Sequence, residues 1–301
     1  MVFLGRGAMR AFEKVFDAKN VDALLAACNE RLPLRAATRA AGWLAAARLG
    51  PLTHLLIRAF IARFGVDMSE MAQREAKGYA TFNEFFARPL ARARTLADAS
   101  LLVPADGTAG ECGAVHAGLA LQAKGSSYSV QALLGGDAAL ARRFEGGQFA
   151  TVYLSPRDYH RVHMPCDGWL TRVVYVPGAL MSVAPRVVQA VPGLFARNER
   201  VVCVFETAHG PLALVLVGAA IVGSVQLPWQ GRVMRAAREA APQVWDYSAQ
   251  HMRLVRGQEM GRFLMGSTVV MLWRQPQPLR FEADWRSGAR ARQGQALANT
   301  H

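Results

Sequence analysis

The sequence predicts an α+β protein in which N-terminal amphipathic helices are followed by a mainly β domain. Between Arg31 and Phe64, arginines and large apolar residues mix in a pattern typical of amphipathic helices. Beyond Leu101, short apolar or alternating runs punctuated by glycine and proline replace that pattern, as strands and turns require. With 301 residues, 52% of them hydrophobic, the chain is long enough for one large domain or two small ones.

The segment from Arg31 to Phe64 contains six arginines and no acidic residue, beside many Leu, Ile and Phe residues and Trp43. Pro51 divides it into two helical pieces. A basic helix pair with a wide apolar face suits the surface of an anionic bilayer, and packing of the same face onto the domain is the alternative. The net charge of +13 fits an anionic partner, and without a recognisable binding module we expect no nucleic acid.

The remaining organisation follows from local signals. Residues 1–30 form an N-terminal extension with a short helix near Val21–Cys28, and residues 31–100 form a helical, membrane-associating region. Within that region Thr81 and Glu84 have the spacing of a capping box, and Pro89 ends the helix that follows. Residues 101–275 form the mainly β domain, in which Ala138–Arg143 is a short helix. Strands are expected at 119–123, 149–154, 169–176, 200–205, 212–217, 220–227 and 268–273. Residues 276–301, rich in Arg, Gln, Ala and Gly, are expected to be a mobile tail.

Several classes of protein are disfavoured. No uncharged apolar run reaches the ~18 residues of a transmembrane helix, and the first residues lack the apolar core of a secretory signal. The four cysteines, Cys28, Cys112, Cys166 and Cys203, have neither zinc-ligand spacing nor a disulfide pattern. We therefore expect a cytoplasmic protein with reduced thiols.

Three separate segments carry the residue types of a serine-activating group. Ser267 follows Gly266 and opens the apolar run Val269–Trp273, Asp106 lies in Pro-Ala-Asp-Gly, and His163 lies in Tyr-His-Arg-Val-His-Met-Pro. We predict Ser267 as the nucleophile, His163 as its base and Asp106 as the residue that orients His163. Gly266 has no side chain to block an attack on its carbonyl and tolerates unusual backbone angles.

His160 lies three residues before His163 in the same segment. This spacing puts both rings on one face of a helix or on opposite faces of a strand, while Pro156–Tyr159 indicates a turn. A His-Xaa-Xaa-His pair is also a partial metal site. Because only Asp158 or Asp167 lies near enough in sequence to be a third ligand, we predict no metal.

Together these segments and several others resemble, in order, the phosphatidylserine decarboxylase family. The resemblance runs from about Leu32 to about Trp273. It includes Thr81–Leu90, Lys124-Gly125 with Tyr128-Ser129, Leu194–Arg200, Val217–Ala219 with Gly223-Ser224, and Gly257–Thr268. The chain departs from the family at Ala184, often asparagine, and at Met265, often leucine.

The resemblance implies a proenzyme that cuts itself between Gly266 and Ser267, giving a β chain 1–266 and an α chain 267–301. Ser267 would become a pyruvoyl cofactor that forms a Schiff base with the amine of phosphatidylserine. After loss of CO2, His160 would return a proton and phosphatidylethanolamine would leave. The enzyme would be a carboxy-lyase, peripheral on the cytoplasmic side of the cell membrane. Its chains would associate non-covalently, because the strand 268–273 stays in the sheet, and the processed units would form a homodimer.

Three other functions remain open at this point. The chain could self-process but act on a different amino-acid headgroup. It could be a serine hydrolase that uses Ser267 uncleaved, although the Gly-Xaa-Ser-Xaa-Gly motif is absent around Ser267. It could also be a basic membrane-binding protein without enzymatic activity.

Overall fold

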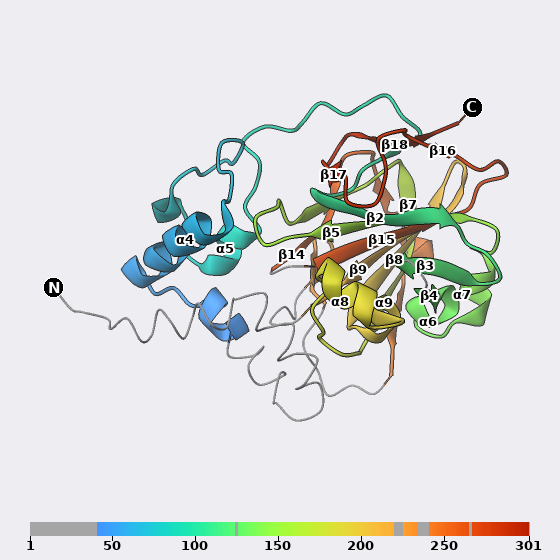
Figure 1. The fold of residues 1–301 in the computed structure, drawn as a ribbon, viewed down its shortest axis with the longest axis horizontal. Helices are drawn as coiled ribbons and strands as arrows, with labels where there is room; N and C mark the ends of the chain where they lie inside the picture. The colour runs from blue at the N-terminus through green and yellow to red at the C-terminus, as the bar shows by residue number, and fades with distance from the viewer. Residues whose placement is uncertain (1–40, 124–125, 220–224, 234–240, 265–266, 301) are drawn as a thin grey trace.

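The computed structural model describes residues 41–123, 126–219, 225–233, 241–264 and 267–300. Within these ranges, helices gather at the N-terminal end and antiparallel strands build most of the remainder (Figure 1). The predicted α+β class with a mainly β domain is confirmed. The predictions for the N-terminal extension, Lys124-Gly125, Gly223-Ser224 and Gly266 lie outside the described residues.

Within the described residues, the helical region contains a helical segment at residues 41–46, α4 (Pro51–Phe64), the 3-10 helix η1 (Ala76–Gly78) and α5 (Phe82–Phe86). Pro51 occupies the first turn of α4, where its missing N–H costs no helical hydrogen bond. Before α5, Thr81 Oγ1 accepts the Glu84 N–H at 3.1 Å, and Glu84 Oε2 accepts the Ala80 N–H at 2.9 Å. The predicted Thr81–Glu84 cap is confirmed, with Ala80 as the reciprocal donor.

An aromatic cluster holds the helical region together. The ring of Phe60 in α4 lies edge-on to Phe82, Phe85 and Phe86, with centroids 5.2, 5.8 and 6.0 Å away. Elsewhere in this region large apolar side chains face solvent: Trp43 is 73% exposed and Leu55 57%. The described helices include none that is both long and apolar enough to cross a bilayer.

The β domain is organised around one large antiparallel sheet, in which nine strands pair over the described residues. Their order is β12 (Gln243–Asp246), β7 (Gly168–Val176), β8 (Arg200–Thr207), β9 (Gly210–Val217), β15 (Ser267–Trp273), β5 (Gln148–Leu154), β2 (Gly107–Ala114) and β17 (Arg290–Ala291), and β13 (Arg253–Leu254) also pairs with β7. In the centre, β15 pairs with β5 on one side and β9 on the other, and all its residues are buried.

Smaller elements surround this sheet (Figure 1). A four-stranded sheet has the order β11 (Gly231–Arg232), β10 (Val225–Leu227), β14 (Glu259–Phe263) and β6 (Arg161–His163). A three-stranded sheet has the order β1 (Leu101–Leu102), β18 (Ala296–Asn299) and β16 (Arg280–Phe281), and β3 (Leu119–Ala123) pairs with β4 (Ser126–Ser129). The short helices are α6 (Val130–Leu133), α7 (Ala138–Arg142), α8 (Pro185–Ala190), α9 (Leu194–Arg197) and η2 (Ser248–Gln250).

The two faces of the large sheet pack into two different cores. Val269, Met271 and Trp273 of β15 belong to the first core, which also contains Val162 and Met164 beside β6. Val270 and Leu272 belong to the second core, which contains residues of α6, α8 and α9. Because side chains alternate along a strand, Ser267 faces the same side as Val269. The nucleophile predicted from sequence is thus directed to the face that carries β6.

Most of the predicted strands are present, but the C-terminal segment differs from its prediction. Instead of a mobile tail, residues after 276 form β16, β17 and β18, and Leu297 and Ala298 are fully buried in the first core. The composition of this segment is polar, yet its few apolar side chains pack beside β1 and its backbone pairs with β1 and β2. The polar residues between them supply turns and exposed positions.

Candidate active site

Ser267 begins the central strand β15, opposite Leu154 at the end of β5. The side chain is buried, with 1% of the residue exposed, and its Oγ has no hydrogen-bond partner among the described residues. A buried hydroxyl without a partner is unfavourable, so the structure does not explain Ser267 by its contribution to stability.

Asp106 reaches the same end of the sheet from the other side of β5. It immediately precedes β2, where Thr108 pairs with Tyr153, and on the opposite side of β5 Tyr153 also pairs with Thr268. The starts of β2 and β15 therefore flank the end of β5, separated by two strand spacings, or roughly 10 Å. Gly107 permits this close packing, because a Cβ there would lie 2.1 Å from the Tyr153 carbonyl oxygen.

A tight turn follows β5 and places the two histidines. The Ser155 N–H and hydroxyl both donate to Asp158 Oδ2, at 2.7 and 2.6 Å, and the Asp158 N–H donates back to the Ser155 carbonyl at 2.9 Å. His160 comes directly after this turn, and His163 ends the short strand β6. The turn indicated by the sequence is present, and the helical alternative for the pair is wrong.

His160 lies in an apolar site against the helical region. Its ring is fully buried, with its centroid 4.0 Å from that of Phe86 in α5. Nδ1 contacts the Asp158 carbonyl at 2.8 Å, and because a carbonyl only accepts, Nδ1 carries the proton of the neutral ring. Nε2 is bare and has no partner among the described residues. Burial, helped by the nearby Arg88 cation, lowers the pKa of His160 to about 3, so the ring is a neutral base.

Arg88, which the sequence analysis does not single out, holds the turn before His160. Its Nη2 donates to the carbonyl oxygens of Arg157 and Asp158 at 2.9 and 3.0 Å. The Asp158 carbonyl therefore accepts hydrogen bonds from both Arg88 and His160. The Arg88 contact fixes the carbonyl, and the carbonyl fixes the imidazole ring. The Arg88 side chain is fully buried, and this burial lowers its pKa.

His163 has a more polar environment on the sheet side of β6. Its Nδ1 donates to the Gly257 carbonyl at 2.8 Å, so Nε2 carries the lone pair and accepts from the Tyr159 hydroxyl at 3.0 Å. Its backbone N–H donates to the Pro104 carbonyl at 2.8 Å, which ties β6 to the segment that bears Asp106. Burial is the main cause that lowers the pKa of His163, while the Gly257 hydrogen bond raises it.

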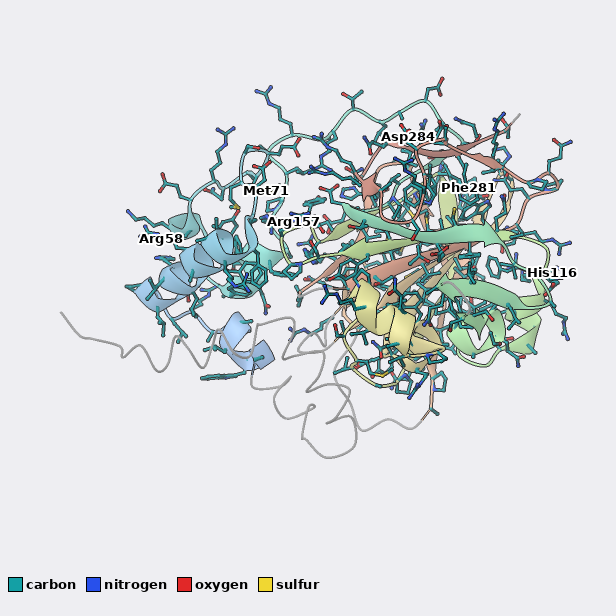
Figure 2. All side chains as sticks on the ribbon, viewed as in Figure 1. Arg58, Met71, His116, Arg157, Phe281 and Asp284 are labelled. Atoms are coloured by element: carbon teal, nitrogen blue, oxygen red, sulfur yellow. The ribbon has the colours of Figure 1, made fainter. Side chains whose placement is uncertain are left out.

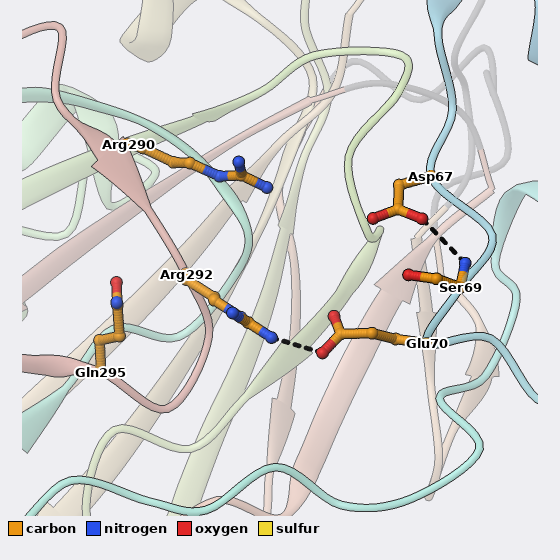
Figure 3. Close-up of a pocket in the computed structure, with 6 residues that line it drawn as sticks. All are labelled: Asp67, Ser69, Glu70, Arg290, Arg292 and Gln295. Carbon is orange, nitrogen blue, oxygen red and sulfur yellow. Dashed lines mark hydrogen bonds and ion pairs between the residues drawn. The ribbon is translucent and has the colours of Figure 1, made fainter.

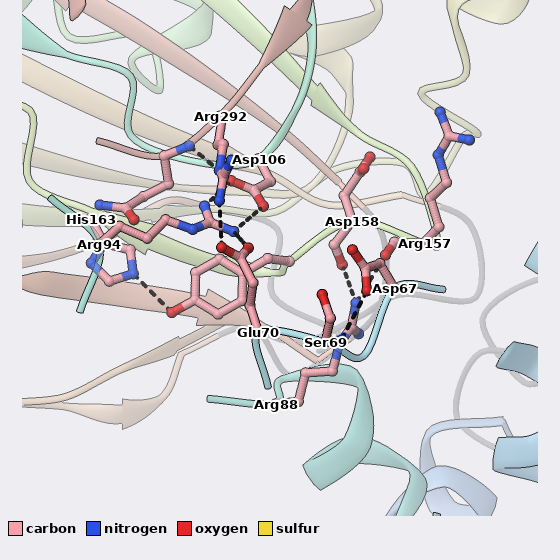
Figure 4. A network of polar contacts seen from close by, with 12 residues as sticks. Asp67, Ser69, Glu70, Arg88, Arg94, Asp106, Arg157, Asp158, His163 and Arg292 are labelled. Carbon is pink, nitrogen blue, oxygen red and sulfur yellow. Dashed lines mark hydrogen bonds and ion pairs between the residues drawn. The ribbon is translucent and has the colours of Figure 1, made fainter. Parts of the chain in front are cut away.

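The Asp106 carboxylate is hydrogen-bonded to Arg94 rather than to His163 (Figure 4). Arg94 donates to both carboxylate oxygens, at 2.6 and 2.9 Å, and the Gln293 N–H adds a contact at 2.8 Å. Arg94 also donates to Glu70 at 2.8 Å, and Glu70 accepts from Arg292. The predicted contact between Asp106 and His163 is therefore replaced here by this network, while the imidazole is held by Gly257 and Tyr159.

The four predicted side chains lie around one end of the sheet. The Phe263 N–H of β14 donates to the His160 carbonyl at 3.0 Å, which brings the strand that leads toward Ser267 against the histidine turn. In the same part of the molecule, a polar hollow of about 460 Å³ is lined by residues of the helical region and the C-terminal segment (Figure 3). These are Asp67, Ser69, Glu70, Arg290, Arg292 and Gln295. Over the described ranges no cluster of three His, Cys, Asp or Glu residues is arranged to hold a metal ion.

Comparisons with known proteins agree with this arrangement. The phosphatidylserine decarboxylase family profile matches residues 82–299, and a second profile, described as PSD, matches residues 30–65. The chain belongs to the phosphatidylserine decarboxylase family. Its relatives include the phosphatidylserine decarboxylase proenzymes of Delftia acidovorans, 55% identical, and of Albidiferax ferrireducens, 56% identical. Each alignment covers 89% of this chain and 94% of the relative. That of Verminephrobacter eiseniae is 54% identical over 92% of this chain and 98% of the relative.

Proposed function

We propose that this protein is a self-processing phosphatidylserine decarboxylase, with Asp106, His163 and Ser267 in maturation and His160 in turnover. The observation that carries the proposal is the buried Ser267 hydroxyl, which has no partner among the described residues, at the sheet end where Asp106, His160 and His163 also lie. The names of the relatives support both the substrate and the proenzyme character.

Maturation requires a base for the Ser267 hydroxyl, which attacks the carbonyl of Gly266. His163 suits this role because its Nε2 is unprotonated and its ring is held on the other side by Gly257. When Tyr159 yields its contact with Nε2, the lone pair is available to take the serine proton. Asp106 is tied to β6 through the backbone, because the His163 N–H donates to the Pro104 carbonyl, and in this proposal its carboxylate supports maturation through Arg94.

The pyruvoyl group derived from Ser267 supplies an electron-accepting carbonyl to which the substrate amine can be joined. The site fits this group: Ser267 is buried, its hydroxyl has no polar contact within the described ranges, and the pairing of Thr268 with both Tyr153 and Val217 anchors it. The group would therefore stand at the start of β15, on the face shared with β6.

His160 suits proton transfer to the substrate. The serine amine of the headgroup is an ammonium at neutral pH, and it must lose a proton before it reacts. The bare Nε2 of His160 accepts that proton and returns it to the α-carbon from which CO2 has left.

The two products of cleavage would stay together without a covalent link. The α chain would contain β15, which pairs with β5 and β9, as well as β17 and β18, which pair with β2 and β1. Removing the 266–267 bond leaves all these hydrogen bonds in place. A homodimer of processed units is part of the same proposal.

The helical region suits a peripheral position on the cytoplasmic membrane face. Trp43, Leu52 and Leu55 are exposed, and the exposed arginines Arg48, Arg58 and Arg63 accompany them. Exposed apolar side chains beside cations bind an anionic bilayer without spanning it. This surface adjoins α5, whose Phe86 packs on His160, so a lipid headgroup would have a short path to the site.

The test is an assay of the purified protein on phosphatidylserine vesicles, with soluble serine and a second aminophospholipid in parallel. Release of CO2 with formation of phosphatidylethanolamine from the vesicles alone is the expected result. Turnover of another amino-acid headgroup, with none on phosphatidylserine, would contradict the substrate assignment and leave the self-processing reaction standing.

A further inference from the structure

Arg94 gathers contacts from segments that are far apart in the sequence. Its guanidinium donates through both Nη atoms to the two carboxylate oxygens of Asp106, which is a two-point contact. It also donates to Glu70 of the helical region and lies 5.6 Å from the centroid of the Tyr159 ring. The Arg94 side chain is only 10% exposed, and that of Asp106 is 16% exposed. The pair is thus shielded from solvent, where a two-point contact fixes both position and orientation.

The position of the Asp106 carboxylate depends on this two-point contact. One oxygen accepts from Arg94 Nη1 and the Gln293 N–H, and the other accepts from Arg94 Nη2. Without Arg94, the carboxylate would keep one backbone donor and a largely buried charge with no cation beside it. It would then turn toward solvent or toward the next available donor.

Arg94 also bears on His163 through Tyr159. The Tyr159 ring that lies beneath its guanidinium carries the hydroxyl that donates to His163 Nε2. The charged or titratable groups that face His163 are Tyr159, Glu259, Arg161 and Arg94. Burial lowers the pKa of His163 most, Glu259 raises it, and the Arg161 and Arg94 cations lower it further.

We propose that Arg94 is a positioning residue for self-cleavage, which fixes Asp106 with a two-point contact and holds its cation over the Tyr159 ring that contacts His163. The inference rests on the proposed function, because it assigns Arg94 to the Asp106, His163 and Ser267 reaction. Arg94 touches none of the reacting atoms and acts through Asp106 and Tyr159.

Two substitutions of Arg94 separate the effect of its two-point contact with Asp106 from the effect of its positive charge. Arg94→Met removes both and should slow cleavage on the order of tenfold to a hundredfold. It should also move the acid limb of the cleavage profile to higher pH, because His163 must be neutral to act as a base and loss of the Arg94 cation raises its pKa. Arg94→Lys keeps the positive charge, so the acid limb of its cleavage profile should stay at the wild-type pH. Its cleavage rate at the plateau should fall, because lysine cannot make the two-point contact with Asp106.

The experiment follows cleavage of full-length precursor made by cell-free translation and transferred to buffers across the pH range. Arg172→Met is the matched control: it removes a half-exposed arginine paired with Asp137 at 2.9 Å on β7, and it should cleave like the wild type. Near-UV circular dichroism establishes whether each variant is folded. If Arg94→Met is not folded, the comparison of Arg94→Lys with the wild type tests the proposal.

The outcomes distinguish failure of the proposed function from failure of the inference about Arg94. An intact wild-type chain overturns both the proposed function and this inference. A wild type that cleaves beside an Arg94→Met variant with the same rate and the same acid limb overturns the inference alone. A folded Arg94→Lys variant that cleaves at the wild-type rate also overturns the inference. An Arg94→Met variant that cleaves more slowly but has the wild-type acid limb overturns it as well.

Discussion

His160 and His163 are separated by two residues, yet their surroundings differ in almost every respect. His160 packs on Phe86, is fully buried, and has a bare Nε2 without a partner among the described residues. His163 has both ring nitrogens occupied, by Gly257 and by the Tyr159 hydroxyl, and it adjoins the segment that carries Asp106. One ring faces the helical region, and the other faces the polar network of the β domain.

This difference supports the proposal that one short motif serves two steps. A base that works once, on a neighbouring serine, benefits from fixed partners and an acidic residue that stabilises its charged form. A base that exchanges protons with a substrate benefits from an unoccupied nitrogen beside an apolar wall, because only the substrate then competes for it. We therefore assign maturation to His163 and turnover to His160.

The largest effect is expected from Ser267→Ala. Cleavage and decarboxylation should both fall to background, because the alanine offers neither a nucleophile nor a source of the pyruvoyl group. The fold should keep its stability, since Ser267 Oγ has no partner among the described residues and its removal deletes an unsatisfied buried group. Gel analysis, decarboxylation assays and thermal unfolding check this; residual decarboxylation by the variant would refute the role of Ser267.

Next in size is the effect of His163→Ala and Asp106→Ala on maturation. Both precursors should remain uncleaved, because either the base or the carboxylate that holds Arg94 is missing while the nucleophile is intact. Electrophoresis of freshly made protein measures this directly. Substitution of the exposed His209 by alanine is the control and should leave maturation normal; complete cleavage of His163→Ala would remove the distinction between the two histidines.

A more selective effect is expected from His160→Ala. The chain should cleave and yet decarboxylate about 10²- to 10⁴-fold more slowly, the usual contribution of a general acid–base group. The two readouts are the fraction cleaved and the turnover of the cleaved protein on phosphatidylserine vesicles. Normal turnover would show that another group returns the proton to the α-carbon.

The smallest effect concerns the pH dependence of maturation. Cleavage needs neutral His163, and because burial lowers its pKa below the usual 6.5, the neutral form persists to lower pH than in an exposed histidine. The acid limb of the cleavage rate should therefore lie below pH 6.5. Stopped translation reactions sampled over time at each pH give this limb; a midpoint above 6.5 would contradict the environment described for His163.

The sequence predicts the parts of this molecule whose signals are local. Apolar runs such as Val269–Trp273 identify central strands, and Pro51 and Thr81 mark helix starts. The strand β2 escapes prediction because Gly107, Gly110 and Gly113 resemble a turn, although they allow close packing on β5. The edge strand β12 escapes it because its residues are mostly exposed and lack an apolar run.

The same division applies to the candidate site. Asp106, His160, His163 and Ser267 stand in recognisable motifs, so the sequence identifies them. Arg88, Arg94 and the Gly257 carbonyl become important only when the folded chain brings them to the site from distant segments. Arg94 in particular lies in an alanine-rich connection whose composition gives no sign of a contact with Asp106.

The central claim is most directly tested by an intact mass spectrum of the purified protein under denaturing conditions. The account predicts two chains that meet between Gly266 and Ser267, the smaller one lighter by one ammonia than the same peptide beginning with serine. A single full-length chain, or a smaller chain with an unmodified N-terminal serine, would contradict it.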